Sequence, residues 1–225
     1  QTVTVSLNGK DYTTTVSADG SWTLNVPAAD LAGLTDGSVT VTASVSDKAG
    51  NPASVDHNLA VDITVPAVTI NTVAGDDVIN IAEHSQAHII SGTATGAAAG
   101  DKVTVTIGGQ TYTTVLDAAG NWSVGVPASV ISGLSDGTVT VTASVTDAAG
   151  NTGTGSHDVT VDTGLPSVNF NAISDDNVLN AVEKGQDLSV SGTSANLAEG
   201  TVVTVTLNGK NYTATTAADG TWSLT

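Results

Sequence analysis

The feature that most constrains the fold is a self-repeat with a period of 100 residues. Trp22, Trp122 and Trp222 stand 100 residues apart. Residues 1–62 align with residues 101–162 without a gap and are identical at about half of their positions. Repetition at a fixed period is typical of a chain that is built from copies of one structural unit. The sequence therefore predicts tandem copies of a unit of about a hundred residues.

Proline-containing segments mark the boundaries between the copies. Pro66 follows Val-Asp at 61–62, and Pro166 follows Val-Asp at 161–162. Proline stiffens a short extended linker, so each segment is interpreted as a joint. We expect a section of a longer tandem array, in which neighbouring repeats of the same chain are partners. The expected domains are the C-terminal part of one repeat at 1–62, a complete repeat at 63–162, and the N-terminal part of a further repeat at 163–225.

Alternation of apolar and polar residues dominates the complete repeat. Val103, Val105 and Ile107 alternate with Thr104 and Thr106, which is typical of half-buried strands. Seven strands in about 100 residues predict an all-β fold class, namely tandem seven-stranded antiparallel immunoglobulin-like β-sandwiches in a linear array. The expected strands lie near 67–72, 86–94, 102–108, 111–116, 121–126, 137–146 and 155–162, with a short helical turn at 127–134.

Composition excludes several functions. The 225 residues include 22 acidic and 5 basic side chains, all five of them lysines, for a formal net charge of −17. Nucleic acid and anionic membranes would be repelled, so neither is an expected partner. The chain has no cysteine, which excludes disulfides and thiolate metal sites. No stretch approaches the roughly 18 apolar residues of a membrane helix, so no membrane insertion is expected.

Acidic and amide side chains gather in turns and at strand ends. Asp47 and Asn51 bound the turn DKAGN, and the next repeat carries DAAGN at 147–151. Calcium takes six to eight hard oxygen ligands in flexible geometry, which clusters of Asp, Asn and Glu supply. The candidate metal ligands are Asp62, Asp162, Asp76, Asp77, Asp147, Asn151, Asp47, Asp136, Asp176 and Glu83.

Chain direction sorts these turns between the two joints. If the strands alternate up and down, residues 147–151 face Asp62 from one side of the first joint and Asp36 faces it from the other. At the second joint, residues 76–77 and Asp136 meet Asp162 from one side and Asp219 from the other. A bound dication would offset the repulsion between these carboxylates and lock adjacent repeats together. No EF-hand loop or glycine-rich nonapeptide is present, so this hypothesis rests on clustering and position.

Ordinary turn chemistry competes with the metal hypothesis at the Asp-Gly positions. For Asp36, Asp136, Asp19 and Asp219 it is the slightly favoured interpretation. Calcium is the favoured interpretation at Asp62, Asp162, Asp147 and the pair Asp76–Asp77.

Three segments carry a family resemblance. They are DITVPAVTINTVAGDDVINIAE from Asp62, YTTVLDAAGNWSVGVP from Tyr112 and LSDGTVTVTASVTDAAGN from Leu134. They resemble the bacterial Ig-like repeats of giant, type I-secreted RTX adhesins of Gram-negative bacteria, which bind biofilm matrix, host cells or other surfaces. The resemblance implies a long extender that is stiffened by Ca²⁺ at the domain joints, with ligands among Asp62, Asp162, Asp76, Asp77, Asp147 and Asn151. It also implies secretion to the bacterial cell surface, and binding of a surface or host-cell receptor by domains outside this segment.

The two joints differ in sequence. The complete repeat has Thr64 and Asp77 where the next has Gly164 and Asn177, so the two joints need not bind calcium equally.

The sequence offers little support for an enzymatic function. His84 and His88 stand four apart beside Glu83, but the next repeat has Lys184 and Leu188 at the matching positions. Ser156, His157 and Asp158 are adjacent in the chain, whereas a catalytic triad is assembled from separated positions. We expect no enzyme.

A module that binds carbohydrate or ice is the alternative function. Threonines on one strand face could present a ladder of hydroxyls, and Trp122 or Tyr112 could stack on a sugar ring. Threonine also suits the solvent face of a sheet, and the two aromatic residues alternate towards the core. The favoured function is a non-enzymatic, calcium-stabilised extender of a cell-surface adhesin.

Overall fold

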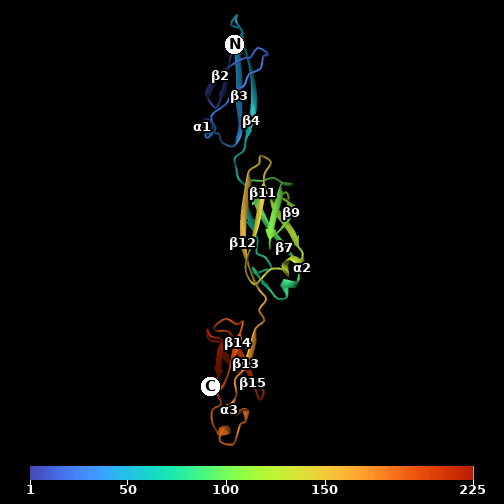
Figure 1. The fold of residues 1–225 in the computed structure, drawn as a ribbon, viewed down its shortest axis with the longest axis vertical. Helices are drawn as coiled ribbons and strands as arrows, with labels where there is room; N and C mark the ends of the chain where they lie inside the picture. Colours follow the sequence, from blue (N-terminus) through green and yellow to red (C-terminus); the bar gives the residue numbers. More distant parts are fainter. Residues whose placement is uncertain (225) are drawn as a thin grey trace. The chain divides into compact units, whose positions relative to one another are not determined.

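The computed structural model describes residues 1–224, other than the side chain of Asp175. The chain forms two compact units, made of residues 1–73, 89–126 and 140–158 and of residues 74–88, 127–139 and 159–225. Strands dominate both units (Figure 1), which confirms the all-β fold class. None of the helices in the described residues is long and apolar enough to cross a membrane.

The first four strands form one antiparallel sheet, here called the N-terminal sheet, in the order β2-β1-β3-β4. Alternate residues Val3, Val5 and Leu7 are buried on one face, as the period of a strand requires. Trp22 is 41% exposed, because residues 21–27 form no strand in the described chain. The elements are β1 (Thr2–Leu7), β2 (Lys10–Thr15), α1 (Ala28–Leu31), β3 (Gly37–Ser46) and β4 (Pro52–Val61).

The next strands form the central sandwich, which contains a three-stranded sheet in the order β10-β7-β5 and a five-stranded sheet in the order β6-β12-β11-β8-β9. All seven expected strands are present, and the short helix falls at α2. The structure adds one short strand, β6, which pairs in parallel with the end of β12. The elements are β5 (Ala67–Ile70), β6 (Val78–Asn80), the 3₁₀ turn η1 (Glu83–Ser85), β7 (His88–Thr95), β8 (Lys102–Ile107), β9 (Gln110–Val115), β10 (Asn121–Val126), α2 (Ala128–Ile131), β11 (Gly137–Thr146) and β12 (Thr152–Asp162).

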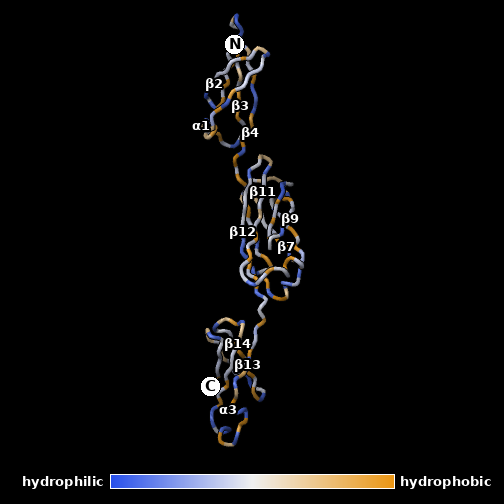
Figure 2. The backbone as a smooth tube through the Cα atoms, in the orientation of Figure 1, coloured by the Kyte–Doolittle hydropathy of each residue, from blue (hydrophilic) through white to orange (hydrophobic). Residues whose placement is uncertain are grey.

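The core of the central sandwich consists mainly of β-branched residues. Ile79, Ile90 and Val103 are fully buried, and the indole of Trp122 is 3% exposed. Figure 2 shows hydrophobic and hydrophilic residues mixed along the strands, in keeping with their alternation between core and solvent.

The last strands form a three-stranded sheet, β13-β14-β17, and a two-stranded sheet, β15-β16. Trp222 lies in a small core with Val203 and Val205, and Phe170 meets its ring edge to face at 5.4 Å between centroids. This C-terminal group contains β13 (Ser167–Phe170), α3 (Ser174–Asn177), the 3₁₀ turn η2 (Glu183–Gly185), β14 (Val190–Ala195), β15 (Val202–Leu207), β16 (Lys210–Thr215) and β17 (Thr221–Leu224).

Candidate functional site

The first linker, residues 62–66, is held by the aspartate that precedes β3. Asp36 Oδ1 accepts the backbone N–H of Ile63 at 2.6 Å, and its Oδ2 accepts the hydroxyl of Thr64. These donors favour the charged form, so the Thr64 hydroxyl and the Ile63 N–H lower the pKa of Asp36. Asp36 is therefore more than an Asp-Gly turn residue, because it ties the end of the N-terminal sheet to the linker.

The loop between β11 and β12 reaches the same linker. Asn151 Nδ2 donates to the backbone carbonyl of Asp62 at 3.1 Å and to Asp147 Oδ2 at 2.9 Å. Asp62 Oδ1 accepts the N–H of Thr64 at 3.2 Å. The structure thus brings residues 147–151 and Asp62 together, at the position that chain direction indicated.

The second linker, residues 162–166, repeats the first contact, with the N–H donor at the equivalent position and the hydroxyl donor one residue earlier. Asp136 Oδ1 accepts both the N–H of Thr163 at 3.1 Å and its hydroxyl at 2.7 Å. Asp162 Oδ1 accepts the N–H of Gly164 at 3.0 Å. Each linker is therefore held by a carboxylate located 27 or 28 residues before its partner in the chain.

Strand β6 brings the Asp76–Asp77 loop beside the second linker. Its parallel pairing places Asn80 opposite Asp162, and the carbonyl of Asp77 accepts the N–H of Thr160 at 2.9 Å. Asp76 Oδ1 caps its own turn by accepting the N–H of Val78 at 3.1 Å. The loop and Asp162 are thus neighbours in the second compact unit.

Two further candidate ligands have local structural contacts. Glu83 Oε2 accepts the N–H of Asn80 at 3.1 Å while Asn80 Oδ1 accepts the N–H of Glu83 at 3.1 Å, which is a capping box for the turn η1. Asp176 Oδ1 accepts the N–H of Val178 at 2.8 Å. Both carboxylates stabilise turns in the structure.

The motif Asp-x-x-Gly-Asn forms the same closed turn wherever it occurs. Asp47 Oδ1 accepts the N–H of Ala49 and the N–H of Asn51, each at 2.8 Å, and its Oδ2 accepts the Asn51 side chain at 2.7 Å. Asp147 and Asp117 make the corresponding bonds. These donors lower the pKa of all three aspartates, with the Asn side chain the largest cause at Asp47 and Asp147 and a backbone N–H the largest at Asp117.

Asp47 does not join the first linker. It follows β3, whereas Asp62 follows β4, and Gly37 pairs with Val61 in this antiparallel hairpin. Ten residues of β3 separate the two ends, which corresponds to about 33 Å at the rise of a strand. Asp47 and Asp62 therefore lie at opposite ends of one hairpin.

The linkers have donor atoms that suit calcium, although the set is incomplete. Asp62, Asp136 and Asp162 each keep Oδ2 without a hydrogen-bond donor among the described residues. Carboxylate oxygens are the ligands that calcium prefers. No group of three or more acidic or histidine side chains in the described part of the chain is arranged to hold a metal. Further ligands would have to come from amide or backbone oxygens or from water.

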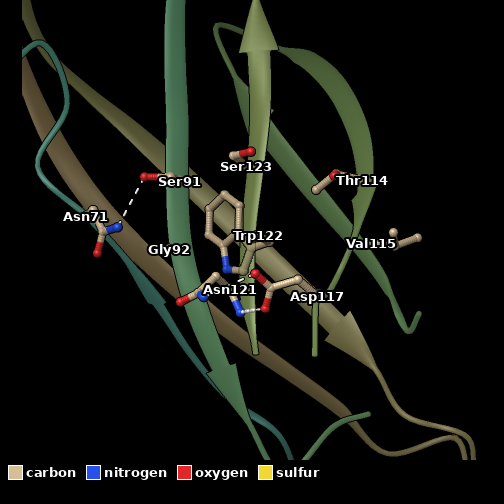
Figure 3. A pocket seen from close by; sticks show the side chains of 9 residues that line it. All are labelled: Asn71, Ser91, Gly92, Thr114, Val115, Asp117, Asn121, Trp122 and Ser123. Carbon is tan, nitrogen blue, oxygen red and sulfur yellow. Dashed lines mark hydrogen bonds between the residues drawn. The ribbon is translucent and has the colours of Figure 1, made fainter. Parts of the chain in front are cut away.

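A cavity of about 370 Å³ on the central sandwich bears on the carbohydrate alternative (Figure 3). Asn71, Ser91, Asp117 and Asn121 contribute polar groups around Trp122. The indole is 3% exposed, however, because it packs on the bare backbone of Gly92. A ring buried in this way offers no free face for stacking on a sugar.

The two histidines that stand four apart also have structural contacts. The ring of His84 is 3.0 Å from the carbonyl of Leu134, through Nε2. The ring of His88 is 2.9 Å from the carbonyl of Glu83, again through Nε2. Each ring thus bonds a backbone carbonyl.

Comparison with known proteins gives a family match. A family model described as a bacterial Ig-like domain matches residues 1–65 and 64–163. No curated protein matches the chain.

Several solved structures are also similar. A Ca²⁺-stabilised adhesin that helps an Antarctic bacterium to reach out and bind ice is 42% identical over 99% of this chain and 55% of its own, with a TM-score of 0.46. A solved chain from a study of a 1.5-MDa bacterial ice-binding adhesin is 36% identical over 99% of this chain and 73% of the solved chain, with a TM-score of 0.47. A tetra-tandem repeat from the extending region of a large adhesion protein is 32% identical over 100% of this chain and 57% of its own, with a TM-score of 0.41. The chain thus spans just over half of the first of these structures.

Proposed function

Because the chain belongs to the bacterial Ig-like domain family, we propose that it is a non-enzymatic extender segment of a large bacterial cell-surface adhesin. Its work is mechanical: the repeats at 1–62, 63–162 and 163–225 hold a terminal binding domain away from the cell. The 100-residue repeat supports this role, as does 36% identity to a solved chain from a study of a bacterial ice-binding adhesin, over 73% of that solved chain. Adhesion and biofilm formation would be served by domains outside this segment.

Calcium at the linkers gives the extender its stiffness. Asp62 at the first linker, and Asp136 with Asp162 at the second, are the residues that would hold the ion. Their Oδ2 atoms accept no hydrogen bond from the described residues, which supports this assignment. The ion supplies positive charge that offsets repulsion between carboxylates in a chain of net charge −17. Extracellular modules bind calcium with a Kd of roughly 10⁻⁴ to 10⁻³ M, so the linkers would stiffen outside the cell, at the bacterial surface.

The observation that carries the proposal is the recurrence of one arrangement at both linkers. At each linker, the aspartate that precedes the first strand of the last hairpin of the repeat, β3 or β11, receives a linker N–H and a linker hydroxyl, and a second aspartate begins the linker. An aspartate with only a solvation role would not be expected to make the same contacts with the linker in both repeats. The repeated contact is what an end-to-end joint requires.

Calcium binding to single-site variants tests the proposal. Isothermal titration calorimetry should show millimolar-range binding that loses one component in Asp62→Ala and another in Asp162→Ala. Asp19→Ala is the matched control, because Asp19 caps only its own turn through Ser21. Unchanged calcium binding in the double variant Asp62→Ala/Asp162→Ala would refute the ligand assignment.

A further inference from the structure

The residues at three equivalent positions differ between the two linkers: 63 and 163, 64 and 164, and 96 and 196. Position 96 or 196 lies near its linker, because Ala67 pairs with Thr95 and Ser167 with Ala195 in the strands that follow each linker. The first linker set is Ile63, Thr64 and Gly96, and the second linker set is Thr163, Gly164 and Asn196.

In the first linker set the threonine occupies the space beside a glycine. Gly96 has a φ of +77°, and a Cβ there would lie 3.2 Å from Thr64 Cγ2 and 3.5 Å from Pro66 Cα. The hydroxyl of the same threonine donates to Asp36. Thr64 therefore contacts the turn after β7 with its methyl group and the carboxylate before β3 with its hydroxyl.

In the second linker set the glycine is in the linker, at Gly164, and the larger residue is in the turn, at Asn196. Asn196 adopts a φ of +55°, which asparagine tolerates better than most residues, and its Nδ2 donates to the carbonyl of Leu165 at 2.9 Å. A Cβ on Gly164 would lie 3.3 Å from Asn196 Cγ and 3.2 Å from Asp162 Oδ1. The side chain now comes from the turn after β14, and the linker supplies the space.

The residue that donates a hydroxyl to the carboxylate also differs between the two linkers. Because Gly164 has no side chain, the bond to the preceding carboxylate is made by Thr163, one residue earlier. The first linker has Ile63 at that position and uses only its backbone N–H. Both linkers thus give the carboxylate one N–H and one hydroxyl, through different residues.

We infer that each linker set is a matched docking contact that fixes how the linker runs along the sandwich it enters, and that the two sets are alternative solutions which cannot be mixed. Asparagine at 96 would meet the methyl group of Thr64, and a threonine at 164 would meet the amide of Asn196. Packing that depends on both partners is non-additive, so a mixed pair should lose docking that a full exchange restores. The contact consists of hydrogen bonds and packing, so it goes beyond the proposed calcium role and operates without the ion.

Pulsed electron paramagnetic resonance can test the inference, because the chain has no native cysteine. Nitroxide labels at Thr13→Cys and Thr113→Cys, on exposed positions of β2 and β9, report the distance distribution across the first linker. In EGTA, Gly96→Asn should broaden the distribution by raising the undocked population about twofold or more. The exchange Ile63→Thr/Thr64→Gly/Gly96→Asn should narrow it again. A single variant that is no broader than the parent, or an exchange variant that stays as broad as the single one, would overturn the inference.

The second linker gives an independent measurement if Gly96→Asn folds poorly. Labels at Thr113→Cys and Thr213→Cys should report broadening in Gly164→Thr and recovery in Thr163→Ile/Gly164→Thr/Asn196→Gly. Thermal melts confirm that each variant is folded. Repeating the series in millimolar Ca²⁺ separates the two proposals: an absence of any calcium effect contradicts the calcium role alone, whereas failure of recovery in EGTA contradicts the matched contact alone.

Discussion

Gly92 shows how one missing side chain sets the core of the central sandwich. A Cβ at this position would lie 1.9 Å from the carbonyl oxygen of Thr69 and 2.5 Å from Cζ2 of Trp122. Gly192 stands in the same relation to Trp222. The recurring tryptophan is therefore a structural residue whose ring is buried against backbone, which the sequence suggested by alternation and which the glycine explains.

Gly92→Ala should destabilise the central sandwich. Overpacking of a close-packed core costs about 1–3 kcal/mol or more, so the midpoint of chemical denaturation should fall clearly. Gly125→Ala on β10 is the matched control, since a Cβ there has no neighbour within 4 Å. Tryptophan fluorescence during denaturation makes the measurement, and equal midpoints for the two variants would contradict the packing account.

The Asp-x-x-Gly-Asn turns should make stability depend on acid pH. N–H donors lower the pKa of Asp117 in the folded chain, so its contribution is present above the ordinary aspartate value of about 3.9 and is lost as the pH falls through the folded-state value. Asp117→Asn should remove part of the decrease in melting temperature between about pH 4 and pH 2.

The control for that experiment is Asp187→Asn, which removes an equal charge from an exposed position in the C-terminal group. If Asp117→Asn and Asp187→Asn change the acid dependence equally, the turn has no special role and only the net charge matters.

At the scale of elements, the sequence predicted the strands in which apolar and polar residues alternate, and it did not predict the short strand β6 or the start of β12. Residues 102–108 and 137–146 alternate strictly, and β8 and β11 lie there. Strand β6 has three residues, too few for a period to be visible, and its parallel pairing depends on a distant strand. Strand β12 begins at Thr152 rather than 155, within a glycine-containing segment that has little intrinsic strand propensity.

The candidate site was predictable in location but only partly in chemistry. Chain direction indicated that residues 147–151 lie beside Asp62 and residues 76–77 beside Asp162, and the structure brings both pairs together. Asp219, which was expected at the second joint, bonds Thr221 in its own turn. The same acidic residues that suggest calcium also build turns from local N–H donors, as at Asp147 and Glu83. Chain direction placed Asp36 at the first joint, but the Asp-Gly dipeptide favoured a turn role and did not reveal its bond to the N–H of Ile63, 27 residues away.

Glycines on β12 should control the position of β5. A Cβ on Gly153 would lie 1.7 Å from the carbonyl oxygen of Pro66, and one on Gly155 would lie 2.4 Å from that of Val68. Gly153→Ala should therefore displace β5 and speed amide hydrogen exchange at residues 67–70, whereas Thr154→Ala, an exposed neighbour, should not. Unchanged protection of β5 in Gly153→Ala would show that the two strands need not approach so closely.

At the scale of the whole molecule, the net charge and the repeat support the proposed extender role. A chain with 22 acidic and 5 basic residues repels itself, and salt screens that repulsion without bridging particular groups. The acids at the linkers recur with the repeat, so a dication could act at each joint in the same way. The account thus predicts a polymer of folded units whose stiffness is set by the calcium concentration.

Small-angle X-ray scattering with parallel thermal melts, in EGTA and across millimolar Ca²⁺, tests this claim most directly. The account predicts that calcium lengthens the maximum dimension or narrows its spread and raises the melting temperature, with a smaller effect from Mg²⁺ at equal concentration, because Mg²⁺ demands stricter geometry. Scattering and melting curves that are identical in EGTA and in calcium would contradict it.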